Sequence, residues 1–465
     1  MTQSYDIVII GAGGGGITAA FEAQRRGAKV ALLEKHKIGG ECTHSGCVPS
    51  KALIDVAKHY HAIESSEVHG LHAIDVKGDF EFSRAMQHVR DIIDGVYSHE
   101  QPKRFNDLGI DTYINETGAK FVDQHTVEIG GERVSGKQII IATGSGPRLL
   151  PTDPDNPVAM LNNENFWSLE KQPESIAFLG GGVISAELGQ ALARFGTRVT
   201  MIDRNSRILG AVDPEVADHL IGVFEGMGIE MVTGANAKVC SRGADGKICI
   251  DIEQGEEGSK TESTLLVDEL FVAIGRVPNL QGLELEAAGI EFSRHGVTVN
   301  DAMQTSVAHI YAVGDVAARA KFSHVANYQA ELVVRNMLNN EDRRNNLSAL
   351  PWAIFTDPEI GHVGMTEAQA RETYDGVQVF KVDAATDRFI TDSKTGGFLK
   401  IVMDKDNRIL GGTGVGAHAG EWVQCLTLAV KHNFKAEDIA DTIFSYPTYA
   451  EIVKKSCSRF LRTKM

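Results

Sequence analysis

The sequence lacks the features of membrane-bound and nucleic-acid-binding proteins. Its longest apolar stretches are strand-sized and interrupted by glycine or charge, well short of the roughly 20 residues that a membrane helix needs. It has no dense Lys/Arg run and its net charge is −16, which argues against nucleic acid and anionic membranes as partners. The N-terminus has no basic segment followed by an apolar block, so we expect a cytoplasmic protein.

Cysteine is also scarce, with six in 465 residues, which excludes an extracellular disulfide framework. Only Cys42 and Cys47 lie close together in the sequence, and we expect His44 between them to be an exposed loop residue. The other four are expected to be small structural residues: Cys240, Cys249, Cys425 and Cys457.

An internal repeat organises the first half of the chain. Residues 6–35 and 175–204 align without a gap, and in each copy an acidic residue follows the first glycine by 23 positions. The matching pairs are Gly11 with Gly180, Gly13 with Gly182, Gly27 with Gly196, Val30 with Val199 and Glu34 with Asp203.

Each copy of the repeat has the pattern of a βαβ nucleotide-binding unit: a buried strand, a glycine turn, an amphipathic helix and a second strand that ends in an acid. Glycines allow the tight turn and the approach of a pyrophosphate, the helix N-terminus attracts phosphate, and the acid accepts hydrogen bonds from a ribose. One such motif is weak evidence and could be a flexible turn, but two copies in register predict two dinucleotide sites. The second copy has Ser185 in place of the third glycine, and serine is small enough for close packing.

The remainder of the chain shows a coarse alternation of helices and strands. A Pro-rich stretch at 147–157 indicates a crossing between domains, and a third region begins near Pro351. We expect helices within 51–107, 420–432 and 436–442, and strands near 118–122, 138–143, 398–402 and 409–415.

The segment GGECTHSGCVPSKAL, residues 39–53, carries the most specific chemistry. Cys42 and Cys47 can lie on one helical turn and its lead-in, close enough to form a disulfide. Pro49 suits the first turn of a helix, so Cys47 is expected near a helix N-terminus, where the dipole and the charge of Lys51 favour thiolate. A metal site would need two more soft ligands at suitable spacing, and none is visible, so no metal site is predicted.

These motifs resemble those of the class I pyridine nucleotide–disulfide oxidoreductases, and the resemblance covers essentially the whole chain. Its most specific part is GGECTHSGCVPSK, which matches the redox-active box of that family. Further matches are IATGS at 141–145, GRVPN at 275–279, YAVGDV at 311–316, FTDPEIGHVG at 355–364 and YPTYAE at 446–451.

The resemblance implies an α/β fold with two Rossmann-like domains, for FAD and NAD(P), and a C-terminal α+β dimerisation domain. The boundaries would be 1–148 for the first part of the FAD domain, 149–277 for the NAD(P) domain, 278–345 for the second, central part of the FAD domain and 346–465 for the interface domain. It also implies a homodimer.

The resemblance implies roles for individual residues. Cys47 would face the flavin and Cys42 the substrate, while Lys51 and Glu187 would pair beside the flavin. The FAD-binding residues would be Gly11, Gly13, Gly16, Glu34, Lys35, Ala119, Thr143, Gly144 and Asp315. The NAD(P)-binding residues would be Gly180, Gly182, Asp203, Arg204 and Gly275.

The sequence departs from the family near its C-terminus. Disulfide-reducing members carry a His-Pro pair with a Glu four residues later, whereas this chain has Tyr446, Pro447 and Glu451. Tyrosine, with an ordinary pKa of about 10, is a poor general base at neutral pH, which argues against efficient dihydrolipoamide or glutathione turnover. Mercuric reductase has tyrosine here but adds a terminal pair of cysteines, and this C-terminus has only Cys457. Tyr446 as a packed aromatic near the dimer interface is the alternative.

The sequence therefore predicts an FAD-dependent NAD(P)H:disulfide oxidoreductase that passes hydride through FAD to the Cys42–Cys47 disulfide, and on to a small disulfide or a thiol-bound metal ion. Alternatives are the dihydrolipoamide dehydrogenase of a 2-oxoacid dehydrogenase complex, a mercuric reductase, and a non-catalytic flavoprotein redox sensor. Asp203 favours NADH, although Arg204 could receive the 2′-phosphate of NADPH.

Overall fold

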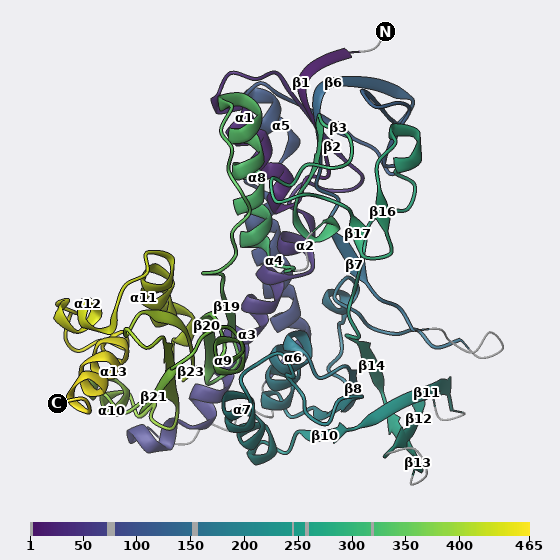
Figure 1. The fold of residues 1–465 in the computed structure, drawn as a ribbon. Coiled ribbons are helices and arrows are strands. Elements are labelled where there is room, and N and C mark those ends of the chain that lie inside the picture. Colours follow the sequence, from purple (N-terminus) through teal and green to yellow (C-terminus); the bar gives the residue numbers. More distant parts are fainter. Residues whose placement is uncertain (1–2, 72–79, 151–156, 244–245, 256–259, 318–319) are drawn as a thin grey trace.

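The computed structural model describes residues 3–71, 80–150, 157–243, 246–255, 260–317 and 320–465. Parts of two predicted segments, 72–79 in the helical region and 151–156 in the Pro-rich crossing, lie outside the described residues. Figure 1 shows an N-terminal domain at the top, a middle domain at the lower right and a C-terminal domain at the left.

The N-terminal domain contains a mixed sheet with the strand order β3-β2-β1-β6-β5-β4, in which β18 also pairs with β6. Pairing is parallel from β3 to β6 and with β18, and antiparallel for β4 and β5. The end of the first strand is a continuous buried apolar run, as expected for a parallel strand covered on both faces. The strands are β1 (Gln3–Ile10), β2 (Val30–Glu34), β3 (Ile110–Ile114), β4 (Ala119–Phe121), β5 (Thr126–Ile129), β6 (Glu132–Ile141) and β18 (Ile310–Ala312).

Helices cover this sheet and extend below it toward the other domains (Figure 1). The first helix packs against α8, so segments about 300 positions apart in the chain form one layer. Two small strands, β16 (Phe292–Ser293) and β17 (Gly296–Val297), form a hairpin. The helices are α1 (Gly14–Arg25), α2 (Gly40–His44), α3 (Cys47–Glu64), α4 (Phe82–Tyr97), α5 (Pro102–Asp107) and α8 (Ser323–Asn339).

The middle domain repeats the βαβ arrangement in a parallel sheet of order β10-β9-β8-β14, and an antiparallel sheet of order β11-β12-β13 is inserted between β10 and β14. Its helices are α6 (Val183–Arg194) and α7 (Pro214–Gly226). The strands are β8 (Ser175–Leu179), β9 (Arg198–Asp203), β10 (Glu230–Thr233), β11 (Ala235–Arg242), β12 (Ile248–Gln254), β13 (Thr261–Val267) and β14 (Glu269–Val272).

The two copies of the repeat share the same turn geometry. Gly11 and Gly180 have φ values of 99° and 100°, in the region that glycine tolerates best. A Cβ atom added to either would lie 2.5 Å from a carbonyl oxygen of the neighbouring strand end, Ala142 or Ala273, so only glycine fits. At the third motif position a Cβ on Gly16 would meet the carbonyl oxygen of Gly11 at 1.9 Å.

The second copy accommodates a side chain at that third position. Ser185 is fully buried, and its hydroxyl donates a hydrogen bond to the carbonyl oxygen of Gly180. The close packing expected for a small residue is therefore achieved with a compensating hydrogen bond.

A two-stranded crossing joins the N-terminal and middle domains. The outgoing strand β7 (Ser145–Pro147) pairs antiparallel with the returning strand β15 (Arg276–Pro278). The chain thus leaves and re-enters the N-terminal domain at one place.

The C-terminal domain is an antiparallel sheet of order β19-β20-β23-β22-β21 with helices packed against it. Its strands are β19 (Pro351–Ile354), β20 (Glu359–Gly364), β21 (Gln378–Asp383), β22 (Phe398–Met403) and β23 (Ile409–Gly416). Its helices are α9 (Glu367–Thr373), α10 (Asp387–Thr391), α11 (Ala419–Lys431), α12 (Ala436–Asp441) and α13 (Glu451–Arg462), so the predicted strands and helices of this region are confirmed.

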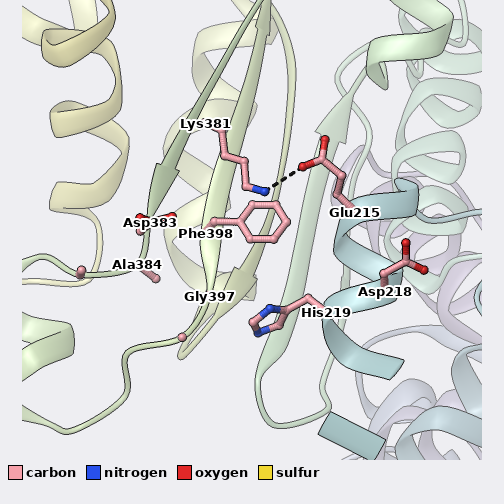
Figure 2. A pocket seen from close by; sticks show the side chains of 10 residues that line it. Glu215, Asp218, His219, Lys381, Asp383, Ala384, Gly397 and Phe398 are labelled. Carbon is pink, nitrogen blue, oxygen red and sulfur yellow. Dashed lines mark hydrogen bonds and ion pairs between the residues drawn. The ribbon is translucent and has the colours of Figure 1, made fainter. Parts of the chain in front are cut away.

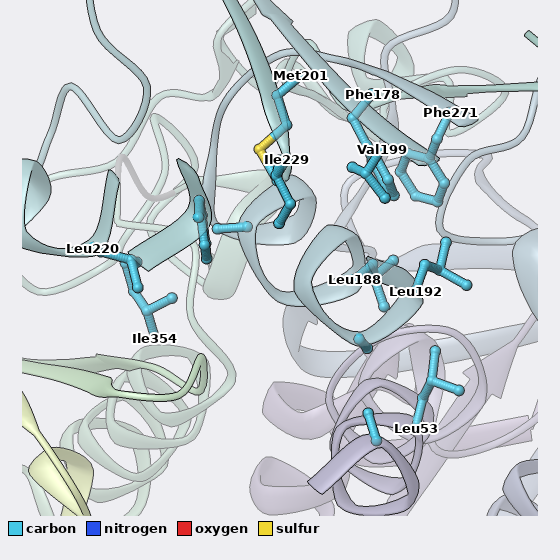
Figure 3. Packing of buried hydrophobic residues seen from close by; sticks show 14 of the residues in the cluster. Leu53, Phe178, Leu188, Leu192, Val199, Met201, Leu220, Ile229, Phe271 and Ile354 are labelled. Atoms are coloured by element: carbon cyan, nitrogen blue, oxygen red, sulfur yellow. The ribbon is translucent and has the colours of Figure 1, made fainter. Parts of the chain in front are cut away.

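One hydrophobic cluster continues through all three domains (Figure 3). It contains Leu53 of α3, Leu188 and Leu192 of α6, and Leu220 of α7 beside Ile354 of β19. Burying each such side chain stabilises the fold by roughly 1.5–3 kcal/mol. The cluster fixes α3 against α6, which positions the residues of the candidate site.

A buried ionic contact also joins the middle and C-terminal domains. Lys400 on β22, with a side chain 6% exposed, contacts carboxylate oxygens of Asp213, Glu215 and Glu367 at 3.1, 3.0 and 2.7 Å. Asp213 is itself buried and caps the N-terminus of α7. Figure 2 shows the adjoining hollow, where Lys381 pairs with Glu215 at 2.8 Å.

We predict that Lys400→Met lowers the free energy of unfolding by about 3–5 kcal/mol, because it leaves the Asp213 carboxylate buried without its cation. The control Lys381→Met removes a lysine whose side chain is 44% exposed and which also contacts Glu215. It should cost less than about 1 kcal/mol. Urea unfolding monitored by tryptophan fluorescence measures both, and equal losses would contradict the assignment.

Candidate active site

The cysteine box forms two helices rather than one turn and its lead-in. Cys42 lies in α2, and α3 begins at Cys47, with Ser45 and Gly46 between the helices. Both cysteines are free thiols, Cys42 half-buried and Cys47 exposed. The expected position of Cys47 at a helix N-terminus is confirmed, since it is the first residue of α3 with Pro49 in the first turn.

The surroundings of Cys47 favour its thiolate. A hydrogen bond from the Cys42 thiol, the Ser323 hydroxyl and the charge of Lys51 outweigh burial and lower the pKa of Cys47 to about 6. The Ser323 Oγ lies 3.8 Å from the Cys47 Sγ and belongs to the first turn of α8. The same hydrogen bond and burial raise the pKa of Cys42, so one thiol of the pair has a lowered pKa and the other a raised pKa.

Lys51 and Glu187 form the predicted ion pair across α3 and α6. The Lys51 Nζ lies 2.8 Å from the Glu187 Oε2 and 4.5 Å from the ring centroid of Phe355. The second carboxylate oxygen, Oε1, accepts a hydrogen bond of 2.9 Å from the backbone N–H of Phe355. Glu187 is buried with both oxygens paired, so it holds the lysine ammonium beside the cysteines.

These side chains line one cavity of about 2400 Å³ between the domains. The cavity also reaches the glycine turn of the first repeat, the strand ends of the N-terminal domain and the N-terminal half of α6. Predicted site residues in its lining are Gly11, Gly13, Glu34, Lys35, Cys42, Cys47, Lys51, Ala119, Thr143, Gly144, Glu187 and Asp315.

The first repeat has the structure of a dinucleotide cradle. Gly13 precedes α1, and no described side chain caps that helix, so its first N–H groups are free of a side-chain partner. The Glu34 carboxylate at the end of β2 accepts a hydrogen bond of 2.7 Å from the backbone N–H of Ala12. Gly16 packs under the turn, outside the cavity lining. These features fit the pyrophosphate and adenosine ribose of FAD.

The second repeat has the equivalent contacts. Asp203 at the end of β9 accepts a hydrogen bond of 2.6 Å from the N–H of Gly181, and Gly182 precedes α6 as Gly13 precedes α1. Arg204 is exposed beside this acid, and Gly275 has a φ of 118° just before β15. None of the predicted NAD(P) residues lines the large cavity, although α6 contributes to both sites.

The polar residues at the strand ends form a network at the bottom of the cavity. The Ser145 hydroxyl donates a hydrogen bond of 2.6 Å to Asp315, and the Thr143 hydroxyl donates one of 2.9 Å to the carbonyl oxygen of Asn279. The Asp315 carboxylate therefore lies just after β18 and lines the same cavity as the first glycine turn.

Tyr446 and Glu451 lie outside this cavity within the single chain. Tyr446 is 69% exposed, and its hydroxyl donates a hydrogen bond of 2.7 Å to Asp387 of α10. That hydrogen bond raises the pKa of Tyr446 above its ordinary value and keeps the phenol protonated. The Glu451 carboxylate is buried and accepts a hydrogen bond from the backbone N–H of Thr448.

The sequence prediction for His44 is wrong. His44 ends α2, is half-buried, and its Nε2 lies 2.8 Å from the carbonyl oxygen of Ile38, while its ring packs edge-on against Tyr97. Packing of α4 against α2 takes the histidine out of solvent. Of the remaining cysteines, Cys240 and Cys457 are buried as predicted, whereas Cys249 and Cys425 are half-buried.

Several lining residues were missed by the sequence reasoning. Glu41 precedes Cys42 within the quoted cysteine box, and Arg276 lies within the quoted GRVPN motif, yet neither was given a role. Phe355 begins the quoted FTDPEIGHVG motif but was given no role, and Ser323 carries no local signal that associates it with the cysteines, because α8 reaches the site only through the tertiary fold.

Two family models match the chain. The pyridine nucleotide-disulphide oxidoreductase model matches residues 5–330, and its dimerisation-domain model matches residues 350–457. The chain belongs to the pyridine nucleotide-disulphide oxidoreductase family. The predicted α/β fold with a C-terminal dimerisation domain is thereby confirmed, and the dimerisation domain supports a homodimer.

Individual relatives of this oxidoreductase span its whole length. Mercuric reductase of Staphylococcus aureus is 32% identical over 98% of this chain and 82% of its own. Dihydrolipoyl dehydrogenase of Bacillus subtilis (strain 168) is 31% identical over 97% of both chains. The solved structure of the HOCl-induced flavoprotein disulfide reductase RclA from Escherichia coli has a TM-score of 0.84 and 26% identity, and covers 98% of this chain and 99% of its own.

The family makes this oxidoreductase an FAD-dependent enzyme that uses a pyridine nucleotide, as predicted. No helix in the part of the chain that the structure describes combines the length and the apolar character needed to cross a bilayer. The cytoplasmic location stays a prediction.

We predict that Lys51→Met raises the pH at which Cys47 of the reduced holoenzyme becomes half-reactive. In the parent protein half-maximal reactivity is expected at pH about 6, with the reactive thiolate present above that pH and lost below it. The variant removes a nearby positive charge, so its midpoint should move upward by about one unit. Alkylation by iodoacetamide, followed for the Cys47 peptide by mass spectrometry, measures the midpoint.

The matched control is Lys58→Met on the same helix, because Lys58 pairs with Glu359 rather than with Glu187. It should leave the midpoint unchanged. An unchanged midpoint in Lys51→Met would exclude charge stabilisation of the thiolate by Lys51.

Proposed function

We propose that this enzyme is an NAD(P)H:disulfide oxidoreductase that works through the Cys42–Cys47 dithiol. When bound, FAD would supply the redox chemistry that links NADH or NADPH to the Cys42–Cys47 disulfide, and the resulting dithiol would reduce a small disulfide or a thiol-bound metal ion. In this scheme the disulfide gains two electrons and two protons for each nucleotide oxidised, and passes both electrons on to the acceptor.

The single observation that carries the proposal is the position of the Cys47 sulfur. It lies at the N-terminus of α3, has a pKa of about 6, and opens into the cavity that contains the first glycine turn. A low-pKa thiolate is a good leaving group in thiol–disulfide exchange, whereas the thiol with the higher pKa retains its proton. These properties favour Cys47 as the flavin-facing sulfur and Cys42 as the sulfur that exchanges with the acceptor.

The cofactor positions follow from the two repeats. FAD would lie along Gly11, Gly13 and Gly16 with its ribose on Glu34, and the strand-end residues would hold the remainder of the molecule. NAD(P) would lie on Gly180 and Gly182, with NADH favoured because Asp203 accepts hydrogen bonds from a free 2′-hydroxyl. The remaining proposed contacts are Lys35, Ala119, Thr143, Gly144 and Asp315 for FAD, and Arg204 and Gly275 for NAD(P).

Tyr446 restricts the kinds of electron acceptor that this enzyme could reduce. In a homodimer this residue would enter the partner subunit's dithiol site, with Glu451 supporting the same segment. A phenol held protonated by Asp387 donates a hydrogen bond but does not remove a proton from a thiol. This argues for an acceptor that needs no strong base, such as a metal ion delivered on a thiol, and one solved relative is a Cu(II) complex of RclA.

Dihydrolipoyl dehydrogenase activity is the second candidate. It is favoured by the 31% identity to the Bacillus subtilis dihydrolipoyl dehydrogenase over 97% of both chains. That activity requires a general base to deprotonate a thiol, and Tyr446 occupies the position of that base in this chain. A non-catalytic redox sensor would retain the flavin but turn over every acceptor slowly.

We predict that the purified holoenzyme oxidises NADH faster in the presence of Hg(II) or Cu(II) thiol complexes than with lipoamide or oxidised glutathione. The kcat/KM for NADH should exceed that for NADPH. Cys42→Ser should abolish acceptor reduction, because no exchange thiol remains, while flavin reduction by NADH is retained. Slow turnover with every acceptor would contradict the proposal and favour the sensor.

We also predict that Tyr446→His raises dihydrolipoamide:NAD⁺ activity by at least about tenfold, because imidazole supplies the missing general base. Tyr446→Phe is the control, since it keeps the ring without adding a base, and it should show no gain. High lipoamide activity in the parent enzyme that neither variant changes would favour dihydrolipoyl dehydrogenase instead.

A further inference from the structure

An ion pair that the proposed chemistry leaves unused lies directly before the first cysteine. The Arg276 guanidinium faces the Glu41 carboxylate with two nitrogens: Nη1 donates to Oε1 at 2.6 Å and Nη2 donates to Oε2. The side chains are 17% and 33% exposed. A bidentate pair of this kind fixes orientation as well as charge.

The arginine is anchored in the crossing between the domains. It begins β15, its Nε donates a hydrogen bond of 2.8 Å to the Ser145 hydroxyl, and its Nη2 donates one of 2.7 Å to the Ser145 carbonyl oxygen on β7. The Ser145 hydroxyl in turn donates to Asp315. Arg276 therefore connects the helix α2, which carries Cys42, to the strands along which the chain enters and leaves the middle domain.

The charge of the Glu41 carboxylate interacts with the charge of the Cys47 thiolate. Burial raises the pKa of Glu41 despite Arg276, and the charges of Asp315 and Cys47 act in the same direction. Electrostatic repulsion between Glu41 and a Cys47 thiolate is mutual, so an unpaired Glu41 would disfavour the thiolate. The Arg276 guanidinium compensates the negative charge of the Glu41 carboxylate.

The groups that face Cys47 come from every element packed around it. They are Cys42 and Glu41 on α2, Lys51 on α3, Glu187 on α6 and Ser323 on α8. Lys51 is shared with Glu187, so its cation already has a carboxylate partner. A second uncompensated carboxylate would leave the site with an excess of negative charge.

We propose that Arg276 is a positioning residue for the dithiol, which holds the helix α2 with Glu41 and Cys42 in place and cancels the Glu41 charge beside the Cys47 sulfur. The inference rests on the proposed function only in taking Cys47 as the reactive thiolate. It assigns to the arginine of the GRVPN motif and the glutamate of the cysteine box a joint electrostatic role.

The test is the pH profile of Cys47 alkylation by iodoacetamide, a neutral reagent, in the reduced full-length holoenzyme. Arg276→Gln exposes the sulfur to an uncompensated carboxylate and should move the midpoint upward by about one unit, equivalent to about tenfold slower alkylation at a pH below both midpoints. Glu41→Gln leaves the arginine cation and should move the midpoint downward. The double variant should return it toward the parent value.

Asn163→Ala is the matched control, because the uncharged Asn163 amide donates a hydrogen bond of 3.2 Å to Glu41 Oε1, which Arg276 Nη1 also contacts. It should leave the midpoint unchanged. A merely structural role predicts that both single variants move the midpoint in the same direction and that the double variant is no better than either. That result would overturn the inference.

If Arg276→Gln does not fold, Arg276→Lys provides the pH profile of Cys47 alkylation in its place. Lysine retains the charge without the bidentate geometry, so the midpoint should stay within about 0.5 unit of the parent value. A shift as large as one unit would overturn charge compensation. Alkylation requires no electron acceptor, so failure of the acceptor panel and failure of this inference are separate results.

Discussion

Compensation of negative charge around the Cys47 sulfur is the constraint on which the rest of the cleft depends. A thiolate in a partly enclosed cavity is costly unless hydrogen bonds and cations face it. Lys51 supplies the cation, but Glu187 already pairs with it and Glu41 adds another carboxylate nearby. In our proposal Arg276 restores the balance by pairing with Glu41, so that the thiolate stays stabilised by Cys42, Ser323, Lys51 and the helix N-terminus.

Local charges can act with this precision only if the helices that carry them hold their positions. The cluster around Leu53 and Leu192 keeps α3 against α6, and Lys400 holds the C-terminal domain against α7. Phe355, which follows β19 of the C-terminal domain, contributes both a backbone N–H to Glu187 and a ring to Lys51. The C-terminal domain therefore has a part in the active site of its own chain, separate from any dimer contact.

The features predicted from the sequence are those set by local constraints. The turn at Gly11 and its copy at Gly180 were predicted because a single backbone conformation excludes every side chain, and that exclusion is visible as a motif. The Lys51–Glu187 pair was implied by the family resemblance. Contacts between distant segments were not predicted: Glu41 and Arg276 lie 235 positions apart, and no periodicity or spacing relates them. His44 was misassigned for the same reason, since its burial depends on Tyr97 of another helix.

Tyr446 stands where disulfide-reducing members of the family carry histidine, and its hydrogen bond to Asp387 affects the chemistry that it can perform. Asp387 accepts the Tyr446 hydrogen bond and thereby holds the phenol in its protonated form at neutral pH. The single phenol proton is donated to Asp387, and a protonated phenol does not activate a thiol by removing its proton. In the proposed scheme the exchanging thiol is Cys42, and the proton acceptor beside it is the Cys47 thiolate, to which the Cys42 thiol donates a hydrogen bond. Under the proposed function the acceptor would bring its own electrophilic centre, so this chain would not need the histidine that disulfide-reducing members carry.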